Sequence, residues 1–315
     1  MSIISYLNGE FLPLERAAVP IEERGHQFGD GVYEVVRVYG GRPFLLEWHL
    51  ERLERSLAAI SIQNPYTKSE WTNVIHEAIR RSQEAEATVY WQVTRGIAPR
   101  SHGFPATAAS VSLVVRPLPG AQDRPEPVKL FALPDQRWAN AYVKTINLLP
   151  NVLAKEAAHH AGAFEALLVR EGVLTEGSSS NVWFVRAGRL YTHSQNRYIL
   201  AGITRRFVLE LAERLNLSVS EQEFRVEDLA EVDEVFLTGT TSEIRLVHEI
   251  FTDQAIRPEL HQLSANPPHG LVPPVQNLKV LWRQADEHFV ASRLQQAFAA
   301  AIDDFRLYGA PFPAL

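Results

Sequence analysis

Short runs rich in β-branched residues alternate along this chain with longer segments whose apolar residues recur at helical spacing. Residues 32–39 form one such run, and Gly40 and Gly41 follow it. Glycine accepts the positive φ angles of a tight hairpin, so this pair predicts a turn. Residues 46–60 then repeat leucine and isoleucine every three or four positions, which is typical of an amphipathic helix. The chain therefore combines strands with helices.

The same patterns predict elements along the rest of the chain. Strands are expected at residues 88–94, 110–115, 128–133, 166–169, 181–185, 189–192 and 234–238, and helices at residues 71–79, 152–161, 204–215 and 289–305.

Residues 118–127 are the clearest linker, because three prolines and a glycine interrupt both periodicities there. A chain of 315 residues is long enough for two domains of ordinary size. We predict a smaller N-terminal α/β domain at residues 1–120 and a larger C-terminal domain at residues 121–315. The latter includes an extended C-terminal segment, 251–315, in which the proline-rich residues 261–276 are expected to form a loop.

Composition excludes several classes of function. The formal net charge is -6, so no cationic surplus points to nucleic acid or an anionic membrane as a partner. The absence of cysteine excludes disulfides, thiolate catalysis and cysteine metal sites, and it fits a reducing, cytoplasmic location. No run of about 18 apolar residues exists, and the first residues lack a secretory pattern, so neither a membrane span nor a signal peptide is expected.

Three positions together suggest a phosphorylated cofactor. Lys144 lies in an apolar run, Glu176 precedes a glycine and three serines, and Thr204 opens a helical segment after Gly202 and Ile203. Lysine can form a Schiff base, a carboxylate can keep a pyridine nitrogen protonated, and a helix N-terminus can take a phosphate. These are the requirements of pyridoxal phosphate. Taken singly, each has an ordinary explanation as a snorkelling lysine, a polar turn or a helix cap.

Other residues could complete such a site. Thr240 lies in a second donor-rich loop, and Arg52 follows His49 by three residues on one helix face. Arg100 and His102 lie two apart in a loop punctuated by glycine and proline, so both can reach one anion. Tyr33 adds a phenol close to a glycine-rich stretch. No metal site is expected, since the adjacent histidines at 159 and 160 cannot face one point from a helix.

In order and spacing these residues resemble the fold-type IV (class IV) pyridoxal-phosphate aminotransferases, and most of all the bacterial D-amino acid transaminases. The resemblance runs from about residue 7 to residue 250. It is carried by Arg24-Gly-His-Gln-Phe-Gly-Asp-Gly-Val-Tyr-Glu34, the helix of Arg52, Arg100-Ser-His102, Lys144 with residues 147–149, and the segments 175–181, 202–205 and 240–243.

The resemblance implies an α+β protein of two α/β domains with the active site between them, assembled as a homodimer. It gives Lys144 the Schiff base and the proton shuttle, and it pairs Glu176 with the pyridine nitrogen. Tyr33, Arg100 and His102 would bind the substrate carboxylate. The phosphate would be held by Arg52, Ile203, Thr204 and Thr240, while Leu200 would pack beside the ring.

The implied reaction is a ping-pong transamination, through pyridoxamine phosphate, between a D-amino acid and a 2-oxo acid such as 2-oxoglutarate or pyruvate. The Arg-x-His pair favours D-amino acids, because it is not the usual arrangement in the branched-chain and (R)-amine relatives. The alternatives are a branched-chain L-amino acid or (R)-amine transaminase, a lyase of the aminodeoxychorismate type, and a catalytically silent carrier of the cofactor.

Overall fold

The apolar run after residue 30 forms strand β3 (Gly31–Tyr39), which turns into the short strand β4 (Arg42–Pro43). The turn residues Gly40 and Gly41 have φ angles of 56° and 76°, so the predicted glycine hairpin is confirmed. On its other side β3 pairs antiparallel with β5 (Ala87–Thr94) over its whole length. Strand β3 is therefore held on both sides by pairing.

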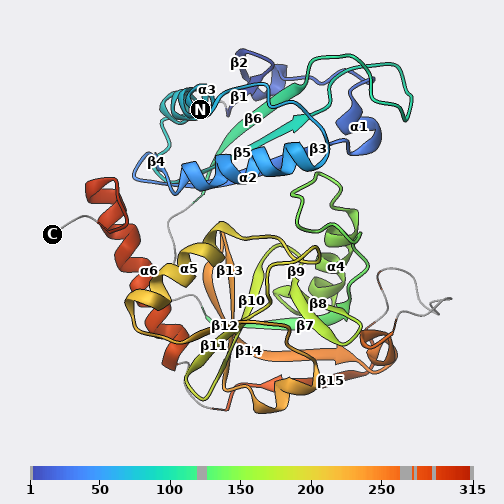
Figure 1. Cartoon of the computed structure of the whole chain (residues 1–315), viewed down its shortest axis with the longest axis vertical. Coiled ribbons are helices and arrows are strands. Elements are labelled where there is room, and N and C mark those ends of the chain that lie inside the picture. The colour runs from blue at the N-terminus through green and yellow to red at the C-terminus, as the bar shows by residue number, and fades with distance from the viewer. Residues whose placement is uncertain (1–2, 119–125, 263–271, 273–274, 286–288, 313–315) are drawn as a thin grey trace. The chain divides into compact units, whose positions relative to one another are not determined.

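The computed structural model describes residues 3–118, 126–262, 272, 275–285 and 289–312. Its contacts divide the chain into two compact units (Figure 1). Unit 1 comprises Met1–Ala121, Val143–Asn147 and Ala301–Leu315, and unit 2 comprises Gln122–Tyr142 and Leu148–Ala300. The expected boundary between residues 120 and 121 lies outside the described residues. The later segment Val143–Asn147 matters most for function, because it carries Lys144.

Unit 1 contains an antiparallel sheet of six described strands in the order β2-β1-β6-β5-β3-β4. The strands not yet given are β1 (Ile4–Leu7), β2 (Glu10–Pro13) and β6 (Ser110–Pro117). Two helices, α2 (Leu46–Ala59) and α3 (Lys68–Ser82), pack on this sheet. Leu53 of α2, Trp71 of α3 and Trp91 of β5 belong to one buried cluster, so the apolar helix faces predicted from the sequence face the sheet.

Short helical turns precede β3 in the chain. They are η1 (Leu14–Arg16) and α1 (Arg24–Phe28), which the sequence patterns do not predict. Helix α1 is capped by Glu23, whose carboxylate accepts a hydrogen bond from the His26 amide at 2.9 Å. The other Glu23 oxygen accepts from the Thr94 hydroxyl at the end of β5, which ties α1 to the sheet.

Unit 2 is built on a mixed sheet of nine described strands, in the order β12-β11-β10-β13-β14-β7-β8-β9 with β15 beside β14. Pairing is parallel between β7 and β8, β7 and β14, and β11 and β12. The strands are β7 (Val128–Pro134), β8 (Glu165–Arg170), β9 (Val173–Gly177), β10 (Asn181–Arg186), β11 (Arg189–Thr192), β12 (Val219–Glu221), β13 (Glu234–Gly239), β14 (Glu243–Asp253) and β15 (Leu278–Arg283).

Helices α4 (Leu149–His160) and α5 (Ile203–Arg214) contact this sheet, as do the turns η2 (Glu227–Glu231) and η3 (Arg257–Leu260). Helix α6 (Phe289–Tyr308) contributes its residues up to Ala300 to unit 2, where Phe298 meets Phe207 edge-on at 5.4 Å. Its remaining residues belong to unit 1, where Phe305 meets Phe44 at 5.0 Å. Each part of α6 therefore has an aromatic contact within its own unit.

Every strand and helix predicted from the sequence is confirmed within a few residues, whereas several others were missed. Residues 175–181 were expected as a loop, but Thr175 and Glu176 lie in strand β9. The long strand β14 and its partner β15 were also missed, although β15 lies inside the extended C-terminal segment. Of the expected loop 261–276, only residues 261–262, 272 and 275–276 are described, and none lies in a helix or strand.

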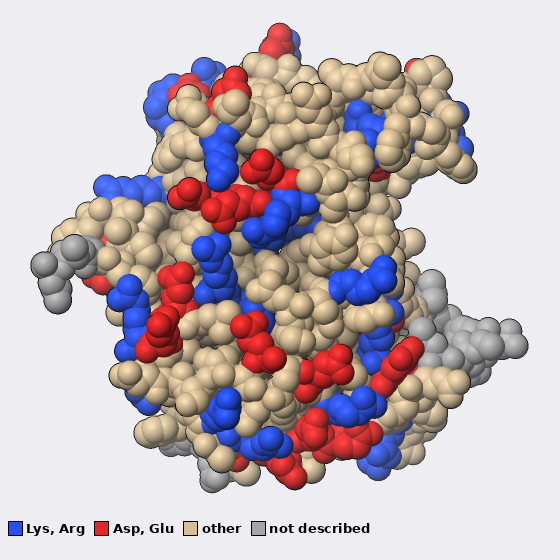
Figure 2. All heavy atoms as spheres, viewed as in Figure 1, with Lys and Arg blue, Asp and Glu red and all other residues tan. Residues whose placement is uncertain are grey.

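Charged side chains of both signs are intermixed on the face shown in Figure 2, as the modest net charge suggests. No helix among the described residues is long and apolar enough to cross a membrane.

Strand β15 contributes a buried tryptophan to unit 2. Trp282 is 6% exposed and donates through Nε1 to the Val232 carbonyl at 2.9 Å. We expect Trp282→Ala to lower the free energy of unfolding by about 3 kcal/mol, because it opens a cavity and leaves this carbonyl unpaired. Urea denaturation followed by circular dichroism measures the change. On the same strand Leu278 is 51% exposed, so Leu278→Ala should cost no more than about 0.5 kcal/mol. Equal losses would contradict this account of β15.

Candidate active site

Lys144 is fixed by its backbone to strand β3 of unit 1. Its carbonyl accepts a hydrogen bond from the Tyr33 amide at 3.0 Å, and its own amide donates to the Ser56 hydroxyl at 3.3 Å. The next residue, Thr145, forms an isolated bridge with Val32. The Nζ of Lys144 lies 4.2 Å from the centre of the Tyr33 ring, and it makes no hydrogen bond or ion pair with any described residue. The amine is thus positioned but not engaged, as a Schiff-base lysine requires.

Arg52 is buried in the same unit and is held by the carboxylate of Glu34. Its Nε and Nη2 donate to the two Glu34 oxygens at 2.7 and 2.9 Å. His49, one helical turn earlier on α2, places Nδ1 2.8 Å from Glu34 Oε2. This Glu34–His49–Arg52 cluster joins strand β3 to helix α2 and sets the direction of the guanidinium.

The electrostatics of this cluster follow from burial and pairing. Burial alone would raise the pKa of Glu34, but the charge and hydrogen bonds of Arg52 outweigh it, and with the His49 bond they bring the pKa to about 2. Burial lowers the pKa of His49, and the charges of Arg52 and Lys144 act in the same direction against the Glu34 bond. At neutral pH the cluster therefore contains an ionised Glu34, a charged Arg52 and a neutral His49.

Arg100 and His102 lie in the exposed loop between β5 and β6, and both contact Phe28 of α1. The Arg100 guanidinium is centred 4.7 Å from the Phe28 ring, and the His102 ring meets the same ring edge-on at 5.7 Å. The structure thus brings the two predicted carboxylate binders to one aromatic side chain, with their polar groups at the surface.

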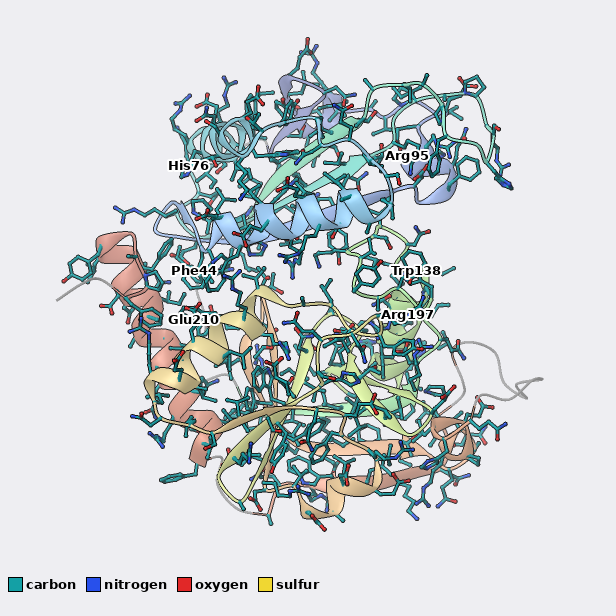
Figure 3. The ribbon with its side chains drawn as sticks, viewed as in Figure 1. Phe44, His76, Arg95, Trp138, Arg197 and Glu210 are labelled. Atoms are coloured by element: carbon teal, nitrogen blue, oxygen red, sulfur yellow. The ribbon has the colours of Figure 1, made fainter. Side chains whose placement is uncertain are left out.

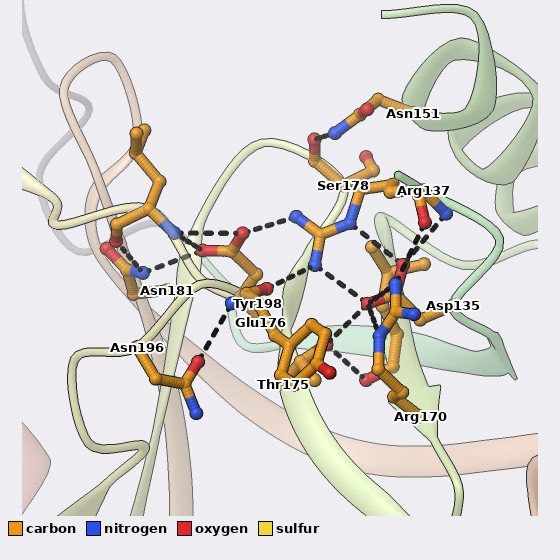
Figure 4. A network of polar contacts seen from close by, with 12 residues as sticks. Asp135, Arg137, Asn151, Arg170, Thr175, Glu176, Ser178, Asn181, Asn196 and Tyr198 are labelled. Carbon is orange, nitrogen blue, oxygen red and sulfur yellow. Dashed lines mark hydrogen bonds and ion pairs between the residues drawn. The ribbon is translucent and has the colours of Figure 1, made fainter. Parts of the chain in front are cut away.

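In unit 2, Glu176 is buried and accepts several hydrogen bonds at the end of strand β9. Its donors are the Arg137 guanidinium, the Asn181 side-chain amide at 2.9 Å and the Leu200 backbone amide at 3.1 Å (Figure 4). The Asn181 amide also donates to the Leu200 carbonyl at 3.0 Å. Leu200 is therefore held by its backbone beside the carboxylate.

Behind Glu176 lies a second buried carboxylate, Asp135. Arg137 donates to both Asp135 oxygens at 2.9 Å, and Arg170 pairs with Asp135 at 3.2 Å. Thr175 shares its hydroxyl between Asp135 and the Leu168 carbonyl. Arg137 thus lies between two carboxylates, as Figure 4 shows.

The two carboxyl groups differ in pKa because they differ in pairing. Burial raises the pKa of Glu176, and the charge and hydrogen bond of Arg137 oppose that rise without cancelling it. For Asp135 burial also acts upward, but the hydrogen bonds and charges of Arg137 and Arg170 prevail and lower the pKa. Arg137 therefore favours the ionised form of both groups.

Helix α5 begins at Ile203 without a side-chain cap. Gly202 stands at the N-cap position, and a Cβ there would collide with the Asn181 amide oxygen, so the close approach requires glycine. The amides of the first helical turn have no partner within the helix, and the helix dipole makes this end favourable for an anion. Thr204 lies in this turn, and Thr240 follows strand β13 in the same unit.

The predicted site residues form two groups, one in each unit. Unit 1 contains Lys144, Arg52, Tyr33, Arg100 and His102, and unit 2 contains Glu176, Leu200, Ile203, Thr204 and Thr240.

Sequence reasoning missed the residues that hold these groups in place. Glu34 and Arg137 were not singled out, although an ionisable residue inside the apolar run of β3 was a usable signal. Asp135 and Arg137 lie just after strand β7, where paired charges mark a buried network. A charge at such a position needs a partner, because burying it alone is costly.

Comparison with known proteins places the chain in a family. Residues 31–250 match the model of the amino-transferase class IV family. The chain belongs to the class IV aminotransferases. Among its relatives this aminotransferase is 40% identical over 242 residues to the D-alanine aminotransferase of Bacillus licheniformis, which covers 75% of this chain and 84% of that protein. It is 38% identical over 254 residues to that of Staphylococcus haemolyticus, covering 79% of this chain and 89% of that one.

Solved structures of the family have the same fold. The branched-chain aminotransferase of Thermoproteus uzoniensis superposes with a TM-score of 0.81 at 24% identity, covering 96% of this chain and 95% of that chain. A second branched-chain amino acid aminotransferase, from T.th., was solved with pyridoxamine 5'-phosphate and gives a TM-score of 0.79 at 25% identity, covering 96% and 94%. The α+β architecture expected from the sequence is confirmed, and class IV aminotransferases depend on pyridoxal phosphate.

The buried network around Arg137 generates a pH-dependent prediction. Without Arg137 the pKa values of Glu176 and Asp135 both rise in the folded protein. A carboxyl group whose folded pKa exceeds its unfolded pKa stabilises below the unfolded pKa, and this contribution is lost as pH rises through the folded pKa. Arg137→Gln should therefore destabilise more at pH 8 than at pH 5, by about 3 kcal/mol at the higher pH.

Urea denaturation at both pH values measures this difference. Arg186→Gln is the matched control, because Arg186 pairs with the exposed carboxylate of Glu231 at 2.8 Å. Its effect should be small and similar at the two pH values. A loss for Arg137→Gln that is the same at pH 5 and pH 8 would show that the carboxyl groups do not depend on this guanidinium.

Proposed function

We propose that this aminotransferase uses pyridoxal phosphate to transfer the amino group of a D-amino acid to a 2-oxo acid, such as 2-oxoglutarate or pyruvate, in a ping-pong reaction. The observation that carries the proposal is the positioned and unengaged amine of Lys144, in a chain 38–40% identical to proteins named D-alanine aminotransferases. Conversion of a D-amino acid by the purified protein is the direct test.

The residues of the two groups suit this cofactor chemically. Lys144 would bind it covalently through Nζ, and Glu176 would pair with the ring nitrogen. The phosphate would be bound by Arg52, by the amide of Ile203 at the start of α5, and by the hydroxyls of Thr204 and Thr240. Leu200, fixed by its backbone to Glu176, would pack against the ring. The uncapped start of α5 supports the phosphate assignment, because its free amides need an acceptor.

When bound, pyridoxal phosphate supplies a ring that accepts the electron pair released at the substrate Cα. The protein does the rest with three groups. Lys144 Nζ would take the proton from Cα and return it at C4′ of the cofactor. Glu176, kept toward its ionised form by Arg137, would hold the proton on the ring nitrogen. The Glu34 carboxylate would hold Arg52 in place.

Tyr33, Arg100 and His102 would bind the substrate carboxylate. Arginine and histidine side chains at the surface, both packed on Phe28, present positive charge and hydrogen-bond donors without a carboxylate partner among the described residues. Tyr33 stacks on Tyr90 at 5.7 Å, which fixes the plane of its ring. Such a binding group would select amino acids over simple amines.

The proposal includes a homodimer and a cytoplasmic location. Ile21 and Phe104 in unit 1 are large apolar side chains exposed to solvent, which is consistent with burial against a second subunit. The absence of cysteine suits a reducing compartment.

Removal of the lysine amine tests the chemistry. Lys144→Ala should lower the turnover of D-alanine with 2-oxoglutarate by at least about 1,000-fold, because no other group takes the Cα proton. Stopped-flow absorbance of the bound cofactor after addition of D-alanine, L-leucine or (R)-1-phenylethylamine measures the half-reaction with each donor. Lys68→Ala, an exposed lysine at the start of α3, is the control and should react as the unmodified protein does. Undiminished turnover in Lys144→Ala, or conversion by L-leucine alone, would overturn the proposal.

Removal of the loop arginine tests the substrate assignment. Arg100→Ala should lower kcat/KM for D-alanine by about 30- to 100-fold, the effect of losing one charged hydrogen-bond donor. An amine without a carboxylate should keep whatever rate it has in the unmodified enzyme. Arg81→Ala, on the surface of α3, provides a charge-matched control. Equal losses for amino acid and amine would show that Arg100 does not bind the carboxylate.

A further inference from the structure

The loop that carries Arg100 and His102 is exposed along its tip, but a buried arginine reaches it from below. Arg24, in helix α1, is 3% exposed. Its Nη1 donates to the carbonyl of Ser101 at 2.6 Å. Ser101 is the residue between Arg100 and His102, so a single hydrogen bond fixes the backbone at the centre of the proposed carboxylate-binding pair.

Arg24 is itself held in place by an acidic residue that pairs with two arginines. Its Nε donates to Asp30 Oδ2 at 2.9 Å, and Arg95 donates to both Asp30 oxygens at 2.8 and 3.1 Å. Arg95, labelled in Figure 3, begins the loop and also donates to the carbonyls of Ile60 and Ser61 at 2.7 and 2.9 Å. Asp30 thereby joins the root of the loop to the arginine that holds its tip.

Asp30 is ionised at neutral pH. Burial alone would raise its pKa, but the hydrogen bonds and charges of Arg95 and Arg24 outweigh that effect and lower the pKa below the ordinary value. The two guanidinium groups therefore keep a charged partner over the whole range in which an aminotransferase is assayed.

The side chains of α1 support the same loop. The Arg24 guanidinium lies 4.9 Å from the centre of the Phe28 ring, and Arg100 lies 4.7 Å from it. His102 meets this ring edge-on at 5.7 Å. The backbone of α1 is joined to the loop as well, since the Arg24 amide donates to the Gly96 carbonyl at 2.9 Å.

We propose that Arg24 is a positioning residue for substrate binding, which acts by holding the Ser101 carbonyl so that Arg100 and His102 are directed at the same carboxylate. The inference rests on the proposed function of these two residues. An exposed loop loses conformational entropy when its side chains are immobilised by a ligand, and a loop fixed beforehand loses less. Arg24 thus contributes to carboxylate affinity without touching the substrate.

A merely structural role for Arg24 makes a different prediction. If it only stabilised unit 1, its loss would lower the free energy of unfolding but would leave the affinity of the folded enzyme for carboxylates unchanged. If it positions the loop, its effect on that affinity must pass through Arg100. The two effects will then not be additive, because residues acting through one another share the same interaction energy.

The experiment measures carboxylate affinity and kinetics on the purified holoenzyme. Propionate, which has a carboxylate but no amino group, is titrated by calorimetry, and KM and kcat are determined for D-alanine. The variants are Arg24→Gln, Arg24→Lys, Arg100→Ala and the double variant Arg24→Gln/Arg100→Ala. Arg80→Gln is the control, because it removes an equal charge from an exposed side chain of α3 that pairs only with Glu77 among the described residues.

We expect Arg24→Gln to raise the Kd for propionate and the KM for D-alanine by about 10-fold, the effect of one lost hydrogen bond to a charged group, while kcat changes by less than about 3-fold. The double variant should bind propionate no more weakly than Arg100→Ala. Arg24→Lys keeps the charge beside Asp30 and one donor for the Ser101 carbonyl, so it should recover part of the affinity. Arg80→Gln should match the unmodified enzyme.

The outcomes separate this inference from the proposed function. If Arg100→Ala weakens propionate binding but Arg24→Gln does not, or if the two losses add in the double variant, Arg24 is not a positioning residue and the proposed function stands. If Arg100→Ala itself leaves propionate and D-alanine unaffected, the carboxylate assignment fails and the inference fails with it. Should Arg24→Gln not fold, an affinity of Arg24→Lys equal to that of the unmodified enzyme, or additivity with Arg100→Ala, would overturn the inference.

Discussion

Buried carboxylates bound to arginines are the interactions on which both halves of the candidate site depend. Glu34 holds Arg52 in unit 1, and Asp135 and Glu176 hold Arg137 in unit 2. A buried charge without a partner costs several kcal/mol, so each carboxylate restricts its arginine to one position. Asp30 extends the same principle to Arg24 and Arg95. The residues proposed to contact cofactor and substrate rest on these pairs.

The contrast between engaged and unengaged groups assigns roles within the site. Arg52, Arg137 and Glu176 are tied by hydrogen bonds before any ligand binds, as electrostatic preorganisation requires. The Nζ of Lys144 makes no hydrogen bond or ion pair with a described residue, although its backbone is fixed to β3. A group that must form a bond and move a proton has to be free to do so, whereas a group that stabilises charge has to be held.

Much of the site could be predicted because its residues lie in short local motifs. The segments around Lys144, Glu176 and Thr204 are recognisable from residue type and spacing alone. The supporting residues could not be found in this way, because each pairs with a partner elsewhere in the chain. Strands β9, β14 and β15 were missed for a related reason: Glu176 and its serines are typical of a turn, and only pairing with neighbouring strands makes the preceding residues extended.

The sequence by itself determined the alternation of strands and helices, the family, and the identity of the residues that can hold a phosphorylated cofactor, since these depend on local periodicity and on side-chain chemistry. Tertiary structure decided which charges meet. Glu34 and Arg52 are 18 residues apart, Arg137 and Glu176 are 39 apart, and Arg24 and Ser101 are 77 apart. It also grouped Val143–Asn147 with the strands of unit 1. Such contacts form because burial forces separated polar groups to find partners, and no local pattern records which partner the folded chain supplies.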